Sequence, residues 1–419
     1  MAEPRKPHVI VCGGGFAGRR AERLLRRNRG LQTTLVDAGG FFEYVPAALR
    51  VMVHPHEALS TVIPQPARTT VAAVTGVEVD PATAGSDAPS VAAVTLSDGR
   101  RLPCDYVLFA TGSSYAAPIK ASQGDWPSGR HGRHRHYRTC CTQLEAVTTA
   151  VVIGGGTVGV ELAAEIADKW RATKRVTLVA SSQSLLDRLP PAAGRAAASW
   201  LRRAGVDLVL GEKVTDYGGA DTAGWGNPGT YTLRTSSGRT LNAGAVFNCT
   251  GGKPVSAYLS TVPGALDAKG LIRCLPTMRL KALRNAFAAG DVADHGVEAT
   301  AMNADLTAVV AAHNIAACAT SGTGVQQAMF PQGACFGATF APDVQAVSLG
   351  KYNGVMVFNQ LVVSGPPVAA LKWTIEAMQL ATARGYSLPT ALWGQVENLT
   401  VFLGTKLFRG RARVAGAGV

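Results

Sequence analysis

The hydrophobic pattern of the chain alternates short β-type runs with longer segments of helical character. The run HVIVC (8–12) precedes a glycine cluster, a helical stretch follows over 16–27, and QTTLVD (32–37) is a second short run. The same order recurs in VVIGGGTVGVELAAEI (151–166) followed by RVTLVASSQ (175–183). A strand, a helix and a strand in this order predict a parallel βαβ unit. The chain therefore carries this unit twice.

A longer repeat supports two nested folds. SDGRRLPCDYVLFATGS (97–113) is echoed by SSGRTLNAGAVFNCTGGKP (236–254), and each predicts a hairpin followed by a buried strand that ends in Thr-Gly. Alternating runs over 71–80 and 91–99 predict an antiparallel meander on a doubly wound sheet. We therefore expect an α/β fold with two Rossmann-like dinucleotide-binding domains plus a small C-terminal α+β region. The expected ranges are 1–113 with 245–330 for the first domain, 114–244 for the second and 331–419 for the C-terminal region.

The pattern changes from residue 336 onward. Strands joined by a turn are predicted up to 365, and a helix over 366–385. The expected apolar face of this helix consists of Val368, Leu371, Ile375 and Met378. In 397–414, apolar residues lie beside cations, which fits a membrane-surface helix, although the same face could pack on the protein body or across a dimer. These residues are Leu399, Phe402, Leu403 and Leu407, with Lys406, Arg409, Arg411 and Arg413.

Composition narrows the class of protein. A chain of 419 residues with 47% apolar and 16% charged residues suits two or three globular domains. The sequence contains no apolar run near the length of a bilayer span and nothing typical of a signal peptide. Its eight cysteines lack CxxC spacing, which argues against a zinc site and favours a reducing intracellular compartment. The net charge of +13 favours anionic partners without choosing among them.

The first glycine cluster has the pattern of a dinucleotide-binding turn. Gly13 is placed for the tight turn, Gly15 for close approach of a pyrophosphate, and Gly18 for packing of the helix on the strand. The helix N-terminus then offers free N–H groups to the phosphates. Asp37 ends the second strand, where a carboxylate can accept hydrogen bonds from an adenosine ribose.

The second cluster repeats the turn with Gly154, Gly156 and Gly159. Ala180, Ser181 and Ser182 stand where Asp37 stood in the first copy. Without a carboxylate this pocket does not repel a 2′-phosphate, which Ser181, Ser182 and Arg188 could bind. NADPH would then be accepted as well as NADH. The alternative is that water and backbone groups hold the ribose.

A third motif, NAFAAGDVAD (285–294), predicts an apolar strand that ends in Gly290-Asp291. Asp291 can bind polyol hydroxyls, and an alanine-rich helix is expected to begin near Ala301. The N-terminus of that helix can stabilise negative charge.

The segment WPSGRHGRHRHYRTCC (126–141) is rich in histidine, arginine and cysteine. Its histidines and cysteines could ligate a metal, but the intervening arginines would repel a cation and no regular ligand spacing is present. We therefore predict a solvated basic loop and no metal site. Because this loop supplies much of the positive charge, nucleic-acid binding is not expected.

Taken together, GGGFAG…VD, ATG, GGGTVGVE, CTG and AAGD resemble the two-dinucleotide-domain flavoprotein family of pyridine-nucleotide reductases. FFEYVPAALRVMV (41–53), the segment 176–210 and SLGKYNGV (348–355) are similar to its apoptosis-inducing-factor-like branch, which includes the ferroptosis suppressor protein and is related to type II NADH dehydrogenases. The resemblance implies that the first fold binds FAD and the second binds NADH or NADPH. The implied FAD residues are Gly13, Gly15, Phe16, Ala17, Gly18, Asp37, Arg50, Thr111, Gly112, Asp291 and Ala301. The implied NAD(P)H residues are Gly154, Gly156, Thr157, Gly159, Glu161, Ser181, Ser182, Gly251 and Gly252.

The resemblance also implies NAD(P)H:quinone reduction at a membrane surface, in which the flavin carries the chemistry. Glu161, in the expected first turn of its helix, is predicted beside the nicotinamide amide, or else it is an acid that the helix dipole stabilises. FFEYVPAALR lacks the CxxxxC pair of the disulfide reductases, so electrons should pass directly from flavin to acceptor. The chain begins Met1-Ala2, so no myristoyl anchor is expected. The glutamine-bearing quinone motif of the type II dehydrogenases is not evident in ATAMNADLTAVV.

Two other functions fit the same residues. The acceptor could be soluble, such as an iron–sulfur or haem protein or an ascorbate radical. The protein could instead be a non-enzymatic NAD(P)H sensor or a nucleic-acid-binding protein that uses the fold as a switch. A homodimer is compatible with each of these functions.

Overall fold

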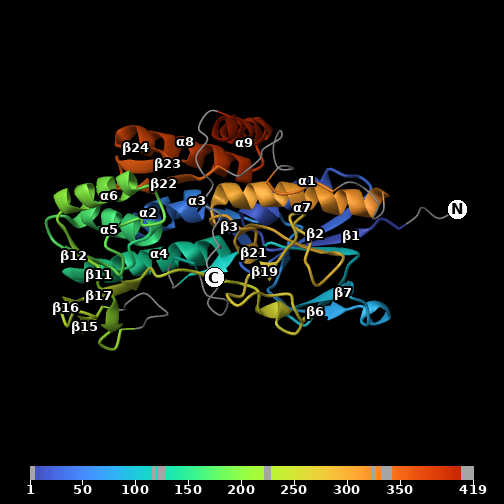
Figure 1. The fold of residues 1–419 in the computed structure, drawn as a ribbon, viewed down its shortest axis with the longest axis horizontal. Coiled ribbons are helices and arrows are strands. Elements are labelled where there is room, and N and C mark those ends of the chain that lie inside the picture. The colour runs from blue at the N-terminus through green and yellow to red at the C-terminus, as the bar shows by residue number, and fades with distance from the viewer. Residues whose placement is uncertain are drawn as a thin grey trace.

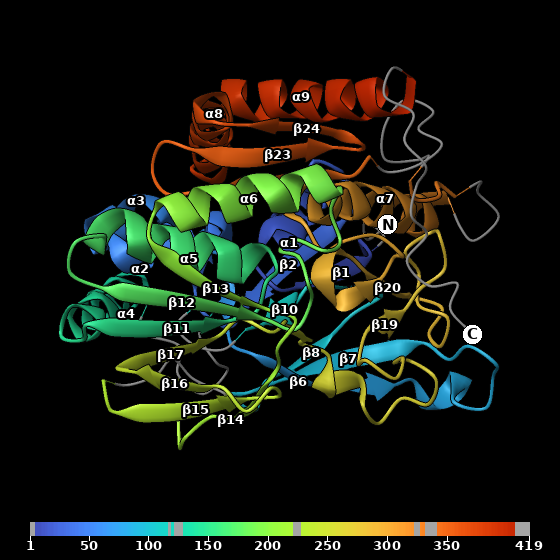
Figure 2. The same cartoon turned by 60° about the vertical axis from the view of Figure 1, so that its left-hand side comes forward.

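A computed structural model describes residues 5–115, 119–120, 129–220, 228–321, 327–331 and 342–406, with side chains up to Gly404 in the last range. It contains two parallel sheets, one in each predicted dinucleotide-binding unit, which lie side by side (Figure 1). The C-terminal strands and helices form a further layer along one side of both units (Figures 1 and 2). The predicted α/β class is confirmed.

The first unit is built on a five-stranded parallel sheet. Its strands, in spatial order, are β20 (Ala286–Ala288), β9 (Tyr106–Phe109), β1 (His8–Cys12), β2 (Gln32–Asp37) and β5 (Thr70–Val71). Helices α1 (Phe16–Arg26) and α7 (Ala301–Ser321) pack beside each other on one face of this sheet (Figure 1). The two short strands β19 (Ile272–Arg273) and β21 (Ala293–Asp294) pair in parallel near its edge.

The second unit repeats this order with a four-stranded parallel sheet. Its strands are β13 (Val206–Leu210), β12 (Arg175–Ala180), β11 (Thr149–Ile153) and β17 (Ala245–Asn248), and its helices are α5 (Thr157–Trp170) and α6 (Pro191–Arg203). The predicted return to the first domain at residue 245 is wrong, because β17 pairs with β11 and completes the second sheet.

Antiparallel strands extend each unit and connect the two. The predicted meander is present as β6 (Val74–Val79), β7 (Val91–Leu96) and β8 (Arg101–Pro103). Its counterpart consists of β14 (Val214–Asp216), β15 (Tyr231–Thr235) and β16 (Thr240–Ala243). The chain crosses between the units where β10 (Ser113–Ser114) pairs with β18 (Lys253–Pro254). Two short strands at this crossing therefore set the position of one unit relative to the other.

The predicted basic loop is wrong over its described part, which forms helix α4 (Gly129–Glu145). Arg133 and Tyr137 are fully buried, and both donate hydrogen bonds to Glu43 of β3 (Phe41–Glu43). An ionised arginine is buried only when a carboxylate compensates it, and Glu43 lies 90 residues away in the sequence. The neighbouring elements are α2 (Ala48–Val53), α3 (Ala58–Thr61) and β4 (Val62–Pro64).

The C-terminal layer consists of a three-stranded antiparallel sheet and two helices. The strands are β22 (Val344–Ser348), β23 (Gly354–Phe358) and β24 (Leu361–Ser364), and the helices are α8 (Pro366–Ala383) and α9 (Ser387–Lys406). Val347, Val355 and Leu380 join the core of the second unit. The predicted apolar face of α8 is shifted, because Leu371 is exposed while Lys372 and Glu376 face the protein.

The predicted membrane-surface segment is only partly described. Leu399 and Phe402 on α9 are exposed, at 56% and 49%, and Leu403 is half-buried. Leu407, Arg409, Arg411 and Arg413 lie outside the described residues, as does the side chain of Lys406. Within the described part of the chain, no helix combines the length and the apolar character needed to cross a bilayer.

Candidate active site

The two glycine turns have the same geometry, and each leaves an opening at the second glycine of its motif, Gly15 or Gly156. A Cβ at Gly13 would lie 2.3 Å from the Ala110 carbonyl oxygen, and one at Gly18 would lie 1.7 Å from the carbonyl oxygen of Gly13. At Gly15, by contrast, nothing lies within 4 Å of the Cβ position. The turn is therefore closed where strand and helix pack and open where a pyrophosphate would approach the backbone.

The second turn shows the same contrast. A Cβ at Gly154 would meet the Cys249 carbonyl oxygen at 2.8 Å, and one at Gly159 would meet the Gly154 carbonyl oxygen at 1.9 Å. Gly156 has nothing within 4 Å and precedes Thr157, the first residue of α5. Each unit thus presents one helix N-terminus beside an open glycine, as a dinucleotide requires. The residues fit FAD in the first unit and NAD(P)H in the second.

The strand ends behind the two turns differ as the sequence indicates. Asp37 accepts hydrogen bonds from the backbone N–H of Gly14 at 2.8 Å and of Gly40 at 2.9 Å. Burial raises the pKa of the Asp37 carboxyl, and these hydrogen bonds oppose the rise. In the second unit Ala180 occupies this position, and Ser181 is exposed. Asp37 therefore fixes the first turn, while the second strand end carries no fixed negative charge.

Predicted FAD residues also meet at the crossing between the units. Asp291 Oδ2 accepts a hydrogen bond from Ser113 Oγ at 2.9 Å and lies 3.7 Å from Lys120 Nζ. Lys120 also donates to the Ser113 carbonyl oxygen at 2.8 Å, and burial lowers the pKa of its ammonium group. The sequence did not identify Lys120 as a candidate site residue, because its contact with Asp291 is formed only in the fold. Thr111 Oγ1 donates to the Val255 carbonyl oxygen at 2.6 Å, so its hydroxyl braces the crossing strand.

The remaining predicted positions lie at turns near this crossing. Gly112 adopts a φ of 70° and Gly251 a φ of 98°. A Cβ at Gly252 would lie 2.7 Å from the Ser114 carbonyl oxygen. Ala301 is the first residue of α7, as predicted.

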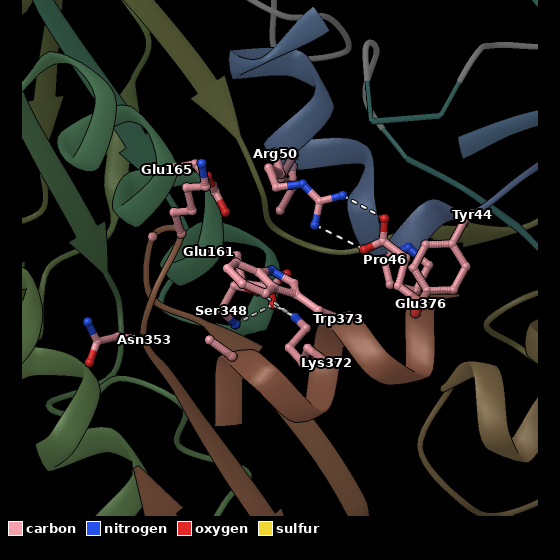
Figure 3. A pocket seen from close by; sticks show the side chains of 14 residues that line it. Tyr44, Pro46, Arg50, Glu161, Glu165, Ser348, Asn353, Lys372, Trp373 and Glu376 are labelled. Atoms are coloured by element: carbon pink, nitrogen blue, oxygen red, sulfur yellow. Dashed lines mark hydrogen bonds and ion pairs between the residues drawn. The ribbon is translucent and has the colours of Figure 1, made fainter. Parts of the chain in front are cut away.

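A narrow pocket forms where α2, α5 and the C-terminal layer meet (Figure 3). Its volume is about 20 Å³, which is room for a water molecule and not for an organic substrate. Glu161 Oε1 accepts hydrogen bonds from Lys372 Nζ and from the Ser348 backbone N–H, both at 2.7 Å. Lys372 Nζ also donates to Ser348 Oγ at 2.6 Å. A single carboxylate thus ties α5 to α8 and to the end of β22.

Glu161 is the fifth residue of α5, so its predicted position in the first turn is wrong. The dipole explanation loses its basis, because the effect falls off within the first turn and the carboxylate pairs with Lys372 instead. Its place beside the nicotinamide stays a prediction.

Arg50, expected in the FAD set, forms a second tie to α8. Its guanidinium donates to both carboxylate oxygens of Glu376, at 3.0 and 2.7 Å (Figure 3). It also donates to Glu57 at 2.7 Å. These two carboxylates raise the pKa of Arg50 despite its burial. Arg50 therefore joins α2 to α8. Its predicted contact with FAD would have to form without breaking these hydrogen bonds.

Glu165 lies one helical turn beyond Glu161 in the same pocket. Its side chain is 3% exposed, and among the described residues its Oε2 atom has no hydrogen-bond partner. Burial, with a smaller contribution from the negative charge of Glu161, raises the pKa of Glu165 to about 7. A group with this pKa can gain or lose a proton at neutral pH. Sequence reasoning missed this residue because ELAAEI reads as an ordinary amphipathic helix.

No group of three or more potential metal ligands occurs among the described residues. The histidines and cysteines at 131–141 lie on α4, where Cys140 and Cys141 are buried.

The chain matches the family described as pyridine nucleotide-disulphide oxidoreductase over residues 7–312, and it belongs to this family. It is therefore a flavoprotein oxidoreductase that uses FAD and NAD(P)H.

Comparisons with individual proteins agree with this assignment. Ferroptosis suppressor protein 1 from Homo sapiens is 30% identical over 310 residues, which cover 74% of this chain and 80% of that protein. FAD-dependent oxidoreductase FVFD30 from Flammulina velutipes is 30% identical over 222 residues, which cover 53% of this chain and 65% of that protein. Apoptosis-inducing factor homolog B from Dictyostelium discoideum is 24% identical over 326 residues, or 74% of this chain and 81% of that protein. The predicted resemblance to this branch is confirmed.

Solved structures confirm the fold. The sulfide:quinone oxidoreductase of Aquifex aeolicus superposes with a TM-score of 0.65 at 18% identity, covering 90% of this chain and 91% of that one.

Proposed function

We propose that the protein is an NAD(P)H:quinone oxidoreductase. The balanced reaction converts NAD(P)H, one proton and a quinone into NAD(P)⁺ and a quinol. Bound FAD would supply the chemistry, accepting hydride from the nicotinamide and passing two electrons on. The residues of the chain then have to orient the dinucleotides, exclude water and supply protons to the acceptor.

The observation that carries the quinone assignment is the proton-holding group in the pocket of Figure 3. A quinone takes up two protons with its two electrons, whereas a haem or iron–sulfur protein takes up electrons alone. Glu165, with a pKa of about 7, shares this pocket with the Glu161–Lys372 ion pair. The pocket also lies between the nicotinamide-side helix α5 and the C-terminal layer. Such a group suits an acceptor that takes up protons with its electrons, as a quinone does.

The described cysteines support direct transfer from flavin to acceptor. The thiols of Cys140, Cys249 and Cys274 are buried, and burial raises the pKa of each to about 12. A reactive cysteine needs the thiolate, which these environments disfavour. No disulfide relay is therefore proposed.

The experiment compares quinone reduction with ferricyanide reduction in Glu165→Gln, whose amide cannot supply the proton. Ferricyanide accepts one electron and no proton, so it reports hydride transfer from NAD(P)H without the proton step. We expect quinone turnover to fall on the order of a hundredfold, as is typical when general acid–base assistance is removed. Ferricyanide turnover should stay within about twofold of the wild type, because it omits the step that this general acid assists.

Glu145→Gln is the matched control, since Glu145 is exposed at the end of α4 and does not line the pocket. It should leave both activities unchanged. If Glu165→Gln slows both acceptors equally while retaining FAD, the pocket serves hydride transfer or folding, and the quinone assignment loses its support.

A further inference from the structure

A second and much larger concavity lies away from the pocket of Figure 3. It is a groove of about 840 Å³ between α1, the segment 63–68 and the residues that join α8 to α9. Seven arginines line it, namely Arg19, Arg20, Arg23, Arg26, Arg27, Arg68 and Arg384. Glu22 is the one acidic residue among its described lining residues. We call this concavity the arginine groove.

The charges of the arginine groove are not balanced within the described chain. Glu22 pairs with Arg68 at 2.9 Å and with Arg26 at 3.5 Å, and Glu397 pairs with Arg20 at 3.0 Å. Two carboxylates therefore pair with three of the seven guanidinium groups.

The other four arginines have no acidic partner among the described residues. Arg19 bonds to Gln65 and to the Ala383 carbonyl oxygen, and Arg384 bonds to the Ser60 carbonyl oxygen. The side chains of Arg23 and Arg27 form no hydrogen bond or ion pair with the described residues, and the buried Arg23 Nη1 atom lacks a partner there. Burial, then the charges of neighbouring arginines, lowers the pKa of Arg19 to about 10 and also lowers that of Arg23. The closely spaced positive charges of these arginines favour binding of an anion.

An exposed apolar stripe on α9 borders the groove. Ser387, Ala391 and Gly394 of α9 line the groove. At 100° per residue, the next face of the helix carries residues spaced three or four apart. These are Leu388, Leu392, Val396, Leu399 and Phe402, with exposures from 37% to 68%. Because Ser387, Ala391 and Gly394 line the groove, the stripe on the next face of α9 borders it. Helix α9 lies in the outermost layer of the molecule (Figure 2).

We propose that the arginine groove binds the phosphate headgroups of anionic phospholipids while the α9 stripe rests in the membrane interface. Guanidinium groups bind phosphate oxygens in a bidentate manner, which accounts for the cations. A soluble polyanion would account for the groove but would leave the adjoining leucines in water, whereas a lipid surface accounts for both features. This proposal goes beyond the quinone assignment and does not depend on the identity of the acceptor.

Vesicle co-sedimentation tests the proposal on the full-length holoprotein. Phosphatidylcholine vesicles are compared with vesicles that also contain phosphatidylglycerol, using the wild type and the double variant Arg23→Gln/Arg27→Gln. We expect wild-type binding only to the anionic vesicles, weakening as salt is added. Since each cation near an anionic surface contributes roughly a fivefold gain in affinity, the double variant should bind at least about tenfold more weakly.

Arg202→Gln/Arg203→Gln is the matched control, because these two exposed arginines end α6, away from the groove. It removes the same charge and should weaken binding less than about twofold. Equal losses in the two double variants would overturn the proposal, since overall charge would then explain binding. Equal binding to both vesicle types would also overturn it.

The stripe has its own test in Leu392→Ser/Leu399→Ser, which should also reduce vesicle binding while leaving FAD content unchanged. Unaltered binding of this variant would contradict the proposal even if the arginine variant failed to fold. A short oligonucleotide that binds the wild type tightly and displaces the vesicles would assign the groove to nucleic acid instead.

Discussion

Glu165 is a carboxyl group whose burial has a consequence for stability. Its ordinary pKa of 4.5 applies in the unfolded chain, while burial raises the pKa to about 7 in the folded protein. Between these values the folded state holds a proton that the unfolded state has released. Stability from this group is therefore fully present below pH 4.5 and is lost as the pH rises through about 7. The loss is at most about 3 kcal/mol, at about 1.4 kcal/mol for each pKa unit.

Glu165→Gln should remove this part of the pH dependence, because the amide stays neutral. We expect the free energy of unfolding of the wild type to fall across the window by up to about 3 kcal/mol more than that of the variant. Denaturant unfolding below and above the window measures the difference. Parallel curves for the two proteins would show that Glu165 ionises normally in the folded state.

Ser181 tests the second strand end, which lacks a fixed acidic residue. Ser181→Glu places a carboxylate where a 2′-phosphate is expected. We predict that kcat/KM for NADPH falls about tenfold, or about 1.4 kcal/mol, while that for NADH changes less than about threefold. Steady-state kinetics with both dinucleotides check this, with Ser199→Glu on the exposed surface of α6 as control. Unchanged NADPH kinetics would mean that the serines do not contact the phosphate.

The two glycine turns are elements that share their geometry and are predicted to bind different dinucleotides, so they form a matched pair. A methyl group at Gly15 or Gly156 enters open space, and the fold should tolerate either change. Gly15→Ala should lower the FAD content of the purified protein. Gly156→Ala should retain FAD and raise KM for NAD(P)H about tenfold, because the methyl group occupies the pyrophosphate approach.

The flavin absorbance per polypeptide and the KM for NAD(P)H distinguish the two turns. Loss of FAD from Gly156→Ala with retention in Gly15→Ala would reverse the assignment of the domains. Gly18→Ala is a useful contrast, because its Cβ would lie 1.7 Å from the Gly13 carbonyl oxygen and the turn could not close.

For single helices, strands and turns, the sequence predicts those features that neighbouring residues determine. The glycine turns, their strands and the start of α7 at Ala301 follow from short patterns of residues. Helix α4 could not be predicted, because Arg133 is buried only by pairing with Glu43, which a linear pattern does not show. The buried face of α8 was missed for the same reason. The charges of Lys372 and Glu376 predict an exposed position. In the fold they face the protein, because Glu161 and Arg50, far away in the sequence, compensate these charges.

The whole molecule combines two dinucleotide-binding units with a layer that contacts both. The β10–β18 crossing links the units, and the C-terminal layer is tied to the second unit through Glu161–Lys372 and to the first through Arg50–Glu376. The C-terminal layer is therefore fixed to both units by buried or half-buried ion pairs. The order of the parts was predictable from the repeat. The Glu161–Lys372 and Arg50–Glu376 ion pairs were not predictable, because they depend on packing between segments that are distant in the sequence.

The central claim is that electrons pass from NAD(P)H through bound flavin directly to a quinone. Anaerobic stopped-flow spectroscopy of the flavin band tests it in two mixing steps. One equivalent of NAD(P)H should bleach the oxidised flavin, and a short-chain quinone should then restore the band at least as fast as steady-state turnover. Flavin that NAD(P)H reduces, that quinone leaves reduced and that a soluble electron-only acceptor reoxidises rapidly would contradict the claim.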